Sequence, residues 1–301
     1  MSKREEQTIA ALAAWQPGIQ VVELTKMPGG MSATMLRAKC QLPTGELREV
    51  VARFPGAYIR ELFEDAGAHE FRVLEAVFRA GLPVPRPLWL GEAHDGHFLL
   101  LEFLPGRATA NPANPTEFIR EMAATLAHIH QTDLSSGQLD FLPQTRSRYI
   151  SSREELNKDF REPEIVATLE EAGEQPVSRS VLRHGDFWPG NILWQDDKIT
   201  GIIDWENALL GPAIADLAIS RLDVLWILGV EAMEEFTARY LELNSINTAT
   251  LPYWDLRTSL RPLPNLEEWA GPYESLGRPD VTTAHIEACL LAFIESALAK
   301  M

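Results

Sequence analysis

The sequence predicts an α+β protein in which a small antiparallel-sheet lobe precedes a larger helical lobe. Three observations predict this class. Short apolar runs separated by glycine and proline turns fill the region before Pro105-Gly106. Longer amphipathic patterns with helical spacing dominate the region after it. The 301 residues, of which 46% are hydrophobic and 23% charged, provide enough core for both parts. The expected boundaries are residues 1–104 and 105–301.

The elements of the first lobe follow from apolar runs and the turns between them. A helix over residues 5–15 precedes the sheet. Strands are expected at 21–25, 34–40, 47–54, 89–91 and 98–103, because Gly, Pro and polar residues separate these runs. A helix over about 61–80 ends at Gly81 and Pro83. These elements predict a five-stranded antiparallel sheet with one main helix over residues 17–103.

The second lobe is predicted to be mostly helical. Residues 116–131 have an amphipathic helical pattern, and a β-rich patch spans 180–204. Helical patterns cover most of the rest, and the clearest are 213–229, 231–243 and 282–299. A short link at 105–106 therefore joins a sheet-plus-helix lobe to a larger helical lobe.

Three polar residues interrupt the β-rich patch of the second lobe. The patch contains two apolar stretches, 192–194 and 199–203. Asp186 lies on the loop before them, Asn191 immediately precedes the first stretch, and Asp204 immediately follows the second. A turn centred on Asp197 and Lys198 would place Asn191 opposite Asp204 at the open end of a hairpin. A purely structural hairpin explains the turn acids, but it does not explain polar residues where apolar strands end.

Carboxylate and amide oxygens that converge in this way suit Mg²⁺, which is bound by few protein ligands together with phosphate oxygens. Phosphoryl transfer requires such ligands together with a base that accepts the proton of the hydroxyl group. Catalytic groups are commonly carried on loops that a rigid scaffold positions. The pattern therefore favours a phosphotransferase over a structural hairpin.

The motifs His184-Gly-Asp186-x4-Asn191 and Ile203-Asp204-Trp resemble the aminoglycoside phosphotransferase / choline kinase-like family. Protein kinases share the Asp-x4-Asn spacing and a later metal-binding Asp. The resemblance implies a bilobal, protein-kinase-like fold and transfer of the γ-phosphoryl group of ATP to a hydroxyl of a small molecule. It also implies that Asp186 is the catalytic base and that Asn191 and Asp204 bind Mg²⁺. In the next block, Asp216 is expected to brace the catalytic loop.

The same resemblance implies that residues 1–104 bind the nucleotide. The expected contacts are Gly29, Gly30, Ser32, Arg53, Glu70, Glu102 and Phe103. Arg53 ends the third strand, where it would hold phosphates, and Glu70 would be its ion-pair partner. Residues 40–157 contain no lysine, so arginine replaces the usual lysine here; its planar fork suits bidentate phosphate contacts. A surface ion pair is the alternative interpretation of Arg53 and Glu70.

Charge and hydropathy limit the partners. The net charge of −16 disfavours nucleic acid and anionic membranes. No apolar run approaches the roughly 18 residues of a membrane span, and acidic residues follow Lys3 and Arg4 where a signal peptide would be apolar. We therefore expect a cytoplasmic protein. Residues 107–301 carry 16 basic and 30 acidic side chains, which suggests a cationic acceptor, such as an aminoglycoside-, choline- or macrolide-like molecule.

Other functions remain open at this point. No lysine follows a glycine, which excludes a Walker-type phosphate loop, and Gly-x-Gly-x-x-Gly is absent. A metal-dependent hydrolase could use the same oxygen ligands without ATP, and a non-catalytic nucleotide-binding module could retain them. The acceptor is expected to bind at residues 253–261 and in the Pro-rich, acidic segment 262–280, where aromatic residues lie beside acids.

Overall fold

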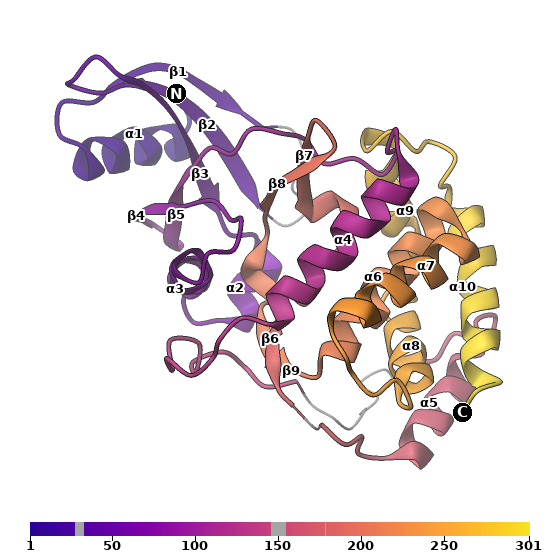
Figure 1. Cartoon of the computed structure of the whole chain (residues 1–301). Coiled ribbons are helices and arrows are strands. Elements are labelled where there is room, and N and C mark those ends of the chain that lie inside the picture. The colour runs from indigo at the N-terminus through magenta and orange to yellow at the C-terminus, as the bar shows by residue number, and fades with distance from the viewer. Residues whose placement is uncertain (28–32, 146–154, 178) are drawn as a thin grey trace. The chain divides into compact units, whose positions relative to one another are not determined.

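The chain forms two structural units in the computed structural model, which describes residues 1–27, 33–145, 155–177 and 179–301 (Figure 1). The first unit comprises Met1–Pro105 together with Gly201–Glu206, and the second comprises Gly106–Thr200 together with Asn207–Met301. The segment 201–206 thus belongs to a unit from which it is distant in sequence.

The first unit is built on a five-stranded antiparallel sheet, as the sequence predicts. Its strands are β1 (Gln20–Lys26), β2 (Thr34–Gln41), β3 (Leu47–Phe54), β4 (Pro87–Ala93) and β5 (Gly96–Glu102). Their spatial order is β1-β2-β3-β5-β4, and every neighbouring pair is antiparallel. β3 lies in the middle, and its residues 50–54 are buried. The sheet therefore holds the end of β3, which includes Arg53, in a rigid and dehydrated position.

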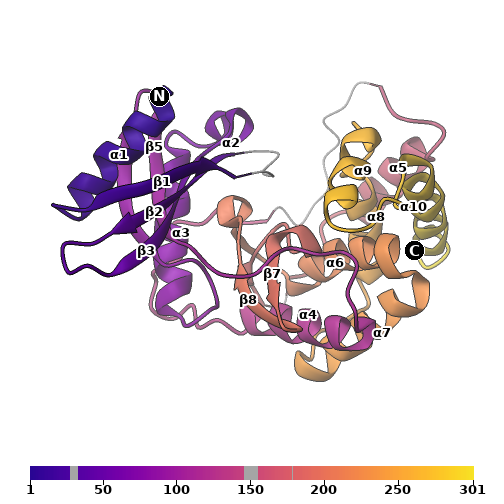
Figure 2. The same ribbon diagram turned by 90° about the horizontal axis from the view of Figure 1, so that it is seen from above.

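Helices cover this sheet. α1 (Lys3–Trp15) starts at a capping box, in which the Ser2 hydroxyl accepts a hydrogen bond from the Glu5 amide and the Glu5 side chain accepts one from the Ser2 amide. Leu12 of α1 is buried in the same apolar cluster as residues of β2, β3 and β5. Figure 2 shows α1 beside the strands.

The single helix expected over 61–80 is wrong, because this region contains two helices. α2 (Ala57–Leu62) ends before Phe63, whose backbone is extended, and α3 (Ala66–Arg79) starts afresh. The Asp65 side chain accepts a hydrogen bond from the Ala68 amide at 3.0 Å. An aspartate in this position stabilises a helix start by satisfying a free backbone donor. The N-cap at Asp65 thus explains the division, and α3 carries Glu70.

The second unit is mainly helical. Its helices are α4 (Pro115–His130), α5 (Glu162–Ala172), α6 (Ala213–Leu228), α7 (Val230–Leu243), α8 (Leu251–Ser259), α9 (Leu266–Ser275) and α10 (Thr283–Leu298). α6 is central, since every residue from Ala213 to Ile227 is buried and α7, α8 and α10 pack against it (Figures 1 and 2). The sequence patterns predict α4, α6, α7 and α10. Helix is also expected over most of the remaining second lobe, but the patterns give no bounds for α5, α8 and α9. In α9 the internal Pro272 weakens the helical pattern.

Two pairs of short strands frame the predicted chemical segment. β6 (Val181–Arg183) pairs antiparallel with β9 (Leu209–Gly211). β7 (Ile192–Gln195) and β8 (Lys198–Ile202) form a hairpin. None of the helices in the described ranges is both long and apolar enough to cross a bilayer.

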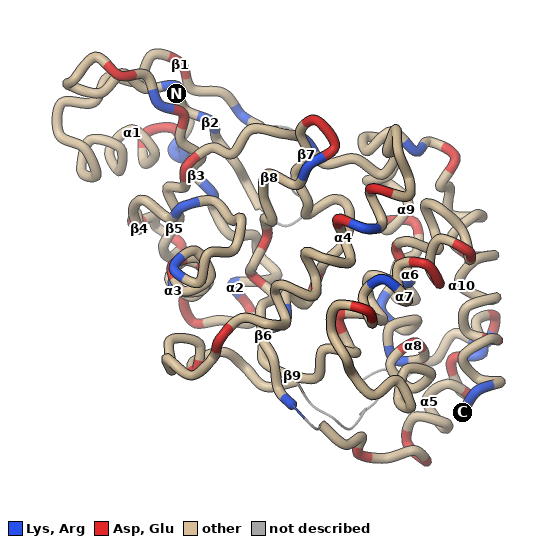
Figure 3. Tube along the Cα trace, viewed as in Figure 1, with Lys and Arg blue, Asp and Glu red and all other residues tan. Residues whose placement is uncertain are grey.

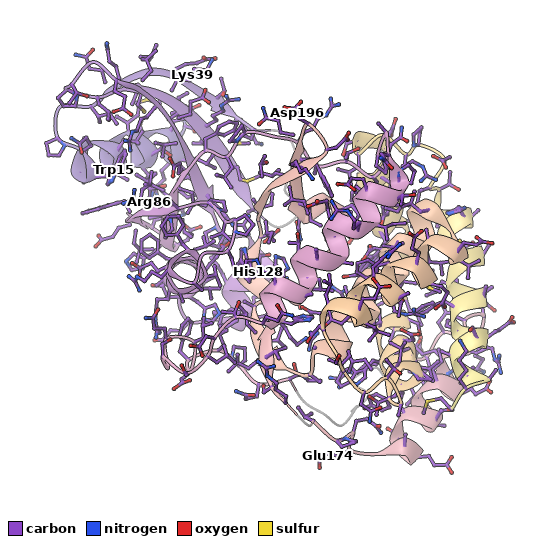
Figure 4. All side chains as sticks on the ribbon, viewed as in Figure 1. Trp15, Lys39, Arg86, His128, Glu174 and Asp196 are labelled. Carbon is purple, nitrogen blue, oxygen red and sulfur yellow. The ribbon has the colours of Figure 1, made fainter. Side chains whose placement is uncertain are left out.

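The turn of the β7–β8 hairpin lies one residue earlier than expected. Asp196 and Asp197 form it, with φ of 50° and 57°. Two successive left-handed residues are typical of a two-residue type I′ turn. This turn shifts the strand pairing, so the expected match of Asn191 with Asp204 across the hairpin is wrong. The two aspartates make an acidic tip (Figure 3), and Figure 4 places Asp196 there, well away from His128 on α4.

Candidate active site

An ion-pair cluster surrounds Arg53 in the first unit. Its Nε donates to Glu70 Oε2 at 2.8 Å, and its Nη2 donates to Asp204 Oδ1 and to Glu206 Oε2, each at 2.6 Å. Arg53, Glu70 and Glu206 are buried, whereas the Asp204 side chain is 22% exposed. The Arg53–Glu70 pair expected from the sequence is therefore present, and it is not a surface pair.

The charges of this cluster are unequal, because three carboxylates face one guanidinium. Burial alone would lower the pKa of Arg53, but Asp204, Glu70 and Glu206 together raise it above its ordinary value. Burial raises the pKa of Glu70, although Arg53 opposes this shift. Arg53 is thus permanently charged, and among the described contacts its Nη1 group makes no hydrogen bond.

Asp204 has an unusual backbone conformation. Its φ of 66° lies in the left-handed region, which costs energy for a residue other than glycine. It lies two residues beyond the end of β8 and immediately precedes the short 3₁₀ helix η2 (Trp205–Asn207). The chain turns at this left-handed residue. Asp204 accepts a hydrogen bond through Oδ1, whereas its Oδ2 makes none with the described residues.

The second cluster, in the second unit, is centred on Asp186. This residue follows β6 and lies on the loop that leads into the 3₁₀ helix η1 (Pro189–Asn191). Asn191 Nδ2 donates to the Asp186 carbonyl at 2.9 Å and to Asp186 Oδ2 at 3.1 Å. Arg261 Nη2 donates to Asp186 Oδ1 at 2.8 Å. Both carboxylate oxygens are thus oriented, and the side chain remains 26% exposed.

Asp216 braces the loop that carries Asp186. Its Oδ2 accepts the backbone amides of His184 at 2.8 Å and Gly185 at 3.3 Å, and its Oδ1 accepts Arg183 Nε at 2.8 Å. Burial opposes ionisation, but the Arg183 guanidinium holds the pKa of Asp216 well below its usual range. This carboxylate, fully buried near the start of α6, fixes the end of β6 and the first two residues of the loop that follows.

Gly185 is required by the same loop. Its φ is 80°, and a Cβ placed there would lie 2.3 Å from the Asn207 carbonyl oxygen. Only glycine combines this conformation with such a close approach. The His-Gly-Asp order is therefore a backbone requirement as well as a chemical one.

Oxygen atoms suited to a hard cation remain in both clusters. Asn191 uses only its Nδ2 in the described hydrogen bonds, which leaves Oδ1 available. Asp204 leaves Oδ2. Oxygen donors of this kind fit Mg²⁺. Among the residues that the structure describes, no group of three or more His, Cys, Asp or Glu is arranged to hold a metal ion, so an ion would need further ligands such as phosphate oxygens.

Two of the expected nucleotide contacts lie where the first unit ends. Glu102 closes β5 and is exposed, and its amide donates to the Arg86 carbonyl at 2.9 Å. The Phe103 amide donates to the Glu49 carbonyl at 3.2 Å, and the Arg37 guanidinium lies 3.9 Å from the centre of its ring. Both amides are therefore used within the first unit. Gly29, Gly30 and Ser32 lie outside the described residues.

Sequence reasoning missed two members of these clusters. Glu206 binds Arg53 from only two positions beyond Asp204, and that proximity was the available signal. Arg261 is 75 residues from Asp186, and no local pattern indicates such a contact. A cavity of about 190 Å³ elsewhere in the second unit, lined by Arg107, Asn111 and Trp194 among others, contains none of the expected site residues.

Comparison with known families identifies the class of this protein. The profile of the "Phosphotransferase enzyme family" matches residues 28–262, which is most of the chain and includes both clusters. This chain belongs to that family. The resemblance read from the His-Gly-Asp-x4-Asn motif is thereby confirmed.

Several curated relatives of this phosphotransferase family member are much longer. "Acyl-CoA dehydrogenase family member 10" of Mus musculus is 29% identical over 173 residues, which cover 51% of this chain and 16% of that protein. "Acyl-CoA dehydrogenase family member 11" of Homo sapiens is 25% identical over 64% of this chain and 29% of that protein. The chain thus spans less than a third of these relatives. "Homoserine kinase" of Methylobacillus glycogenes is 25% identical over 58% of each chain.

Solved structures of phosphotransferases share the fold. Macrolide 2′-phosphotransferase MphH from Brachybacterium faecium has a TM-score of 0.62 and 20% identity, over 95% of this chain and 98% of its own. Spectinomycin phosphotransferase APH(9)-Ia, in complex with ADP and spectinomycin, has a TM-score of 0.63 and 15% identity, over 98% of each. A mutant of aminoglycoside phosphotransferase APH(4)-Ia with AMP-PNP and hygromycin B has a TM-score of 0.57 and 18% identity, over 92% and 95%. The predicted α+β, kinase-like fold is confirmed.

Proposed function

We propose that this phosphotransferase moves the γ-phosphoryl group of ATP, in the presence of Mg²⁺, to a hydroxyl group of a small molecule. The observation that carries the proposal is the Asp186 carboxylate, which Asn191 and Arg261 orient on a loop that Asp216 braces. A partly exposed carboxylate held in this way on a rigid loop is suited to receive a proton.

Asp186 acts as the general base in this reaction. The acceptor oxygen forms a bond with the γ-phosphorus while the bond between that phosphorus and the β,γ-bridging oxygen breaks. ADP leaves with the electron pair of the broken bond, and Asp186 takes the proton of the hydroxyl group. Positioning and charge stabilisation supply most of the rate acceleration in such transfers.

Asn191 and Asp204 would hold Mg²⁺ through Oδ1 and Oδ2, the oxygens that their described hydrogen bonds leave available. The ion, when bound, neutralises the charge of the phosphate oxygens. Arg53 would donate from Nη1 to the phosphates, since Nε and Nη2 are already used by carboxylates. Glu70 would keep that guanidinium in place.

The remaining nucleotide contacts are proposed from the family resemblance. Gly29, Gly30 and Ser32 would cover the phosphates, and Glu102 and Phe103 would border adenine. Support comes from the neighbouring structures that contain ADP or AMP-PNP. The same structures support a small-molecule acceptor, because they contain spectinomycin or hygromycin B.

The acceptor is proposed to bind in the second unit near α8 and α9, and to carry a positive charge. The surplus of acidic residues over 107–301 supports the charge. Aromatic residues also cluster near these helices, since Trp188 and Tyr273 make edge contacts at 5.8 Å and Trp226 and Trp269 at 5.9 Å between ring centres. Trp188 and Trp269 are only partly buried and are suited to hold a cation on the π face, whereas Tyr273 and Trp226 are buried behind them.

Three variants test the reaction. Asp204→Ala should lose Mg²⁺-dependent ATP binding and ADP release together, whereas Asp186→Ala should keep ATP binding and lower turnover by about 10²–10⁴-fold. Asn191→Ala should raise the Mg²⁺ concentration required. ATP affinity, acceptor-dependent ADP release and melting temperature are measured on each.

The rival functions give different results in these assays. A metal-dependent hydrolase would be impaired alike by all three changes and would not require ATP. A binding module would bind ATP without ADP release. Near wild-type turnover in correctly folded Asp186→Ala would refute the proposed base.

A further inference from the structure

Arg261 orients Asp186 through one hydrogen bond, and the proposed reaction gives its other donors no role. It lies just beyond α8, and its amide donates to the Thr258 carbonyl at 3.0 Å. Its side chain extends to Asp186, where Nη2 lies 2.8 Å from Oδ1. The Arg261 side chain is 31% exposed. A cation thus stands in direct contact with the proposed base and is open to solvent.

Most of the hydrogen-bonding capacity of Arg261 is unused. A guanidinium carries five N–H donors, and in the described contacts only Nη2 donates, to a single carboxylate oxygen. The centre of the guanidinium lies 5.4 Å from the centre of the Trp269 ring, within range of a cation–π contact. The aromatic ring restricts the orientation of the group while the remaining donors stay available.

Among the described residues, no second carboxylate forms an ion pair with these donors. Asp223 is a neighbouring buried acid, and its Oδ1 accepts the Tyr273 hydroxyl at 3.0 Å. Burial raises the pKa of Asp223 to about 7, although Arg261 opposes the shift. Near neutral pH this carboxyl is therefore partly protonated, and Asp186 is the carboxylate with which Arg261 pairs directly.

We infer that Arg261 determines acceptor specificity by binding a carboxylate of the acceptor while Asp186 receives the proton of the acceptor's hydroxyl. The inference rests on the proposed function. Arginine with free donors beside an aromatic ring is well suited to bidentate carboxylate recognition. A cationic group would be repelled at this point, so a positive charge on the acceptor must lie elsewhere on the molecule.

The contact between the two residues also limits the acceptor's shape. Because Arg261 Nη2 and Asp186 Oδ1 are only 2.8 Å apart, the hydroxyl and the carboxylate must be separated by few bonds. The acceptor class is therefore small hydroxy acids, including those that also carry an ammonium group.

Matched probes that differ in charge test this inference. One set of probes carries a hydroxyl beside an anionic, neutral or cationic group: glycolate, glycolamide and ethanolamine. A second set makes the same comparison on a sugar ring, with D-glucuronate, D-glucose and D-glucosamine. L-Serine adds a zwitterion. ADP release is measured with each probe and with water alone. We expect the acids or the zwitterion to have the highest kcat/KM in the set.

Variants of Arg261 separate specificity from simple support of Asp186. Arg261→Gln should lower kcat/KM for the acid by about 10- to 100-fold more than for the matched amide, the scale of lost charge-assisted hydrogen bonds. A loss common to both acceptors reports the support that Arg261 gives to Asp186. Arg261→Lys should be intermediate. Arg239→Gln is the matched control, because Arg239 is a half-exposed arginine on α7 whose ion pairs within the described residues are with Glu235 and Glu242.

Several results would overturn the inference. One is a neutral or cationic probe as the best acceptor. A second is an equal loss for acid, amide and water in Arg261→Gln, which would make Arg261 a residue that only positions Asp186. A third is ADP release that depends on Asp186 and occurs with water alone, but that does not increase when any of the acids is added. Absence of any ADP release would instead refute the proposed function itself.

Discussion

Replacement of Asp216 by asparagine should destabilise the protein strongly. The substitution keeps the size of the side chain but removes the charge that Arg183 faces. It also replaces one carboxylate oxygen by an NH₂ group. That group would face either the amides of His184 and Gly185 or the guanidinium of Arg183, all of which are donors. Arg183 and Asp216 are 5% and 0% exposed, so neither charge can turn to water.

The expected loss follows from this burial. Breaking a buried ion pair by removing one partner costs about 3–5 kcal/mol, which is a large part of a typical total stability of about 5–15 kcal/mol. With a urea dependence of about 3 kcal/mol per molar, the unfolding midpoint should fall by about 1–2 M. Because the folded-state pKa of Asp216 is lowered, its stabilisation is complete above pH 3.8 and fades only in stronger acid.

Urea unfolding at neutral pH measures this loss, and Asp255→Asn is the control. Asp255 is also a buried acid that faces a buried arginine, but both oxygens lie 3.3 Å from Arg221. Burial raises its pKa to about 6 despite that arginine. This weaker pair should cost only about 1–2 kcal/mol. A midpoint for Asp216→Asn within about 0.3 M of wild type, or a loss no larger than that of Asp255→Asn, would refute the reasoning.

Two further predictions concern other buried charges. Burial raises the pKa of Asp223 from 3.8 to about 7, so between these pH values the folded state retains a proton that the unfolded state releases. The free energy of unfolding should therefore fall as the pH rises from 3.8 to about 7, by up to about 1.4 kcal/mol per pH unit. Asp223→Asn should remove this slope in urea unfolding at about pH 5 and about pH 8, and an unchanged slope would contradict the assignment. Arg53→Ala should weaken Mg·ATP binding by at least about 1 kcal/mol in calorimetry. Arg53→Lys retains the charge among the three carboxylates and should therefore lose less binding free energy. An unchanged ATP affinity in the alanine variant would remove Arg53 from the site.

Local patterns sufficed for much of the fold and for the chemical motif. The strands of the first unit and the helices α4, α6, α7 and α10 follow from apolar periodicity, which reports which face of an element is buried. Asp186 and Asn191 are five positions apart, so their contact is local and the motif implies it. The backbone conformation of Gly185 is likewise a local requirement, which the His-Gly-Asp order encodes.

Local errors arose where a single side chain or turn type redirects the backbone. The Asp65 N-cap divides one expected helix into α2 and α3. Two left-handed aspartates close the β7–β8 hairpin one residue early. In each case the hydrophobic pattern alone permits a longer helix or a different register, because it does not record where hydrogen bonds to the backbone end an element.

The composition of the charged clusters was decided only by the tertiary structure. Arg53 meets Glu206 across 153 residues of chain, and Arg261 meets Asp186 across 75. A sequence motif shows which side chains are near neighbours along the chain. It does not show which distant arginine reaches a given carboxylate, because that depends on how helices and strands pack. The sequence by itself therefore determined the kinase-like class and the identity of the proposed base, whereas packing determined which cations surround that base and the first-unit carboxylates.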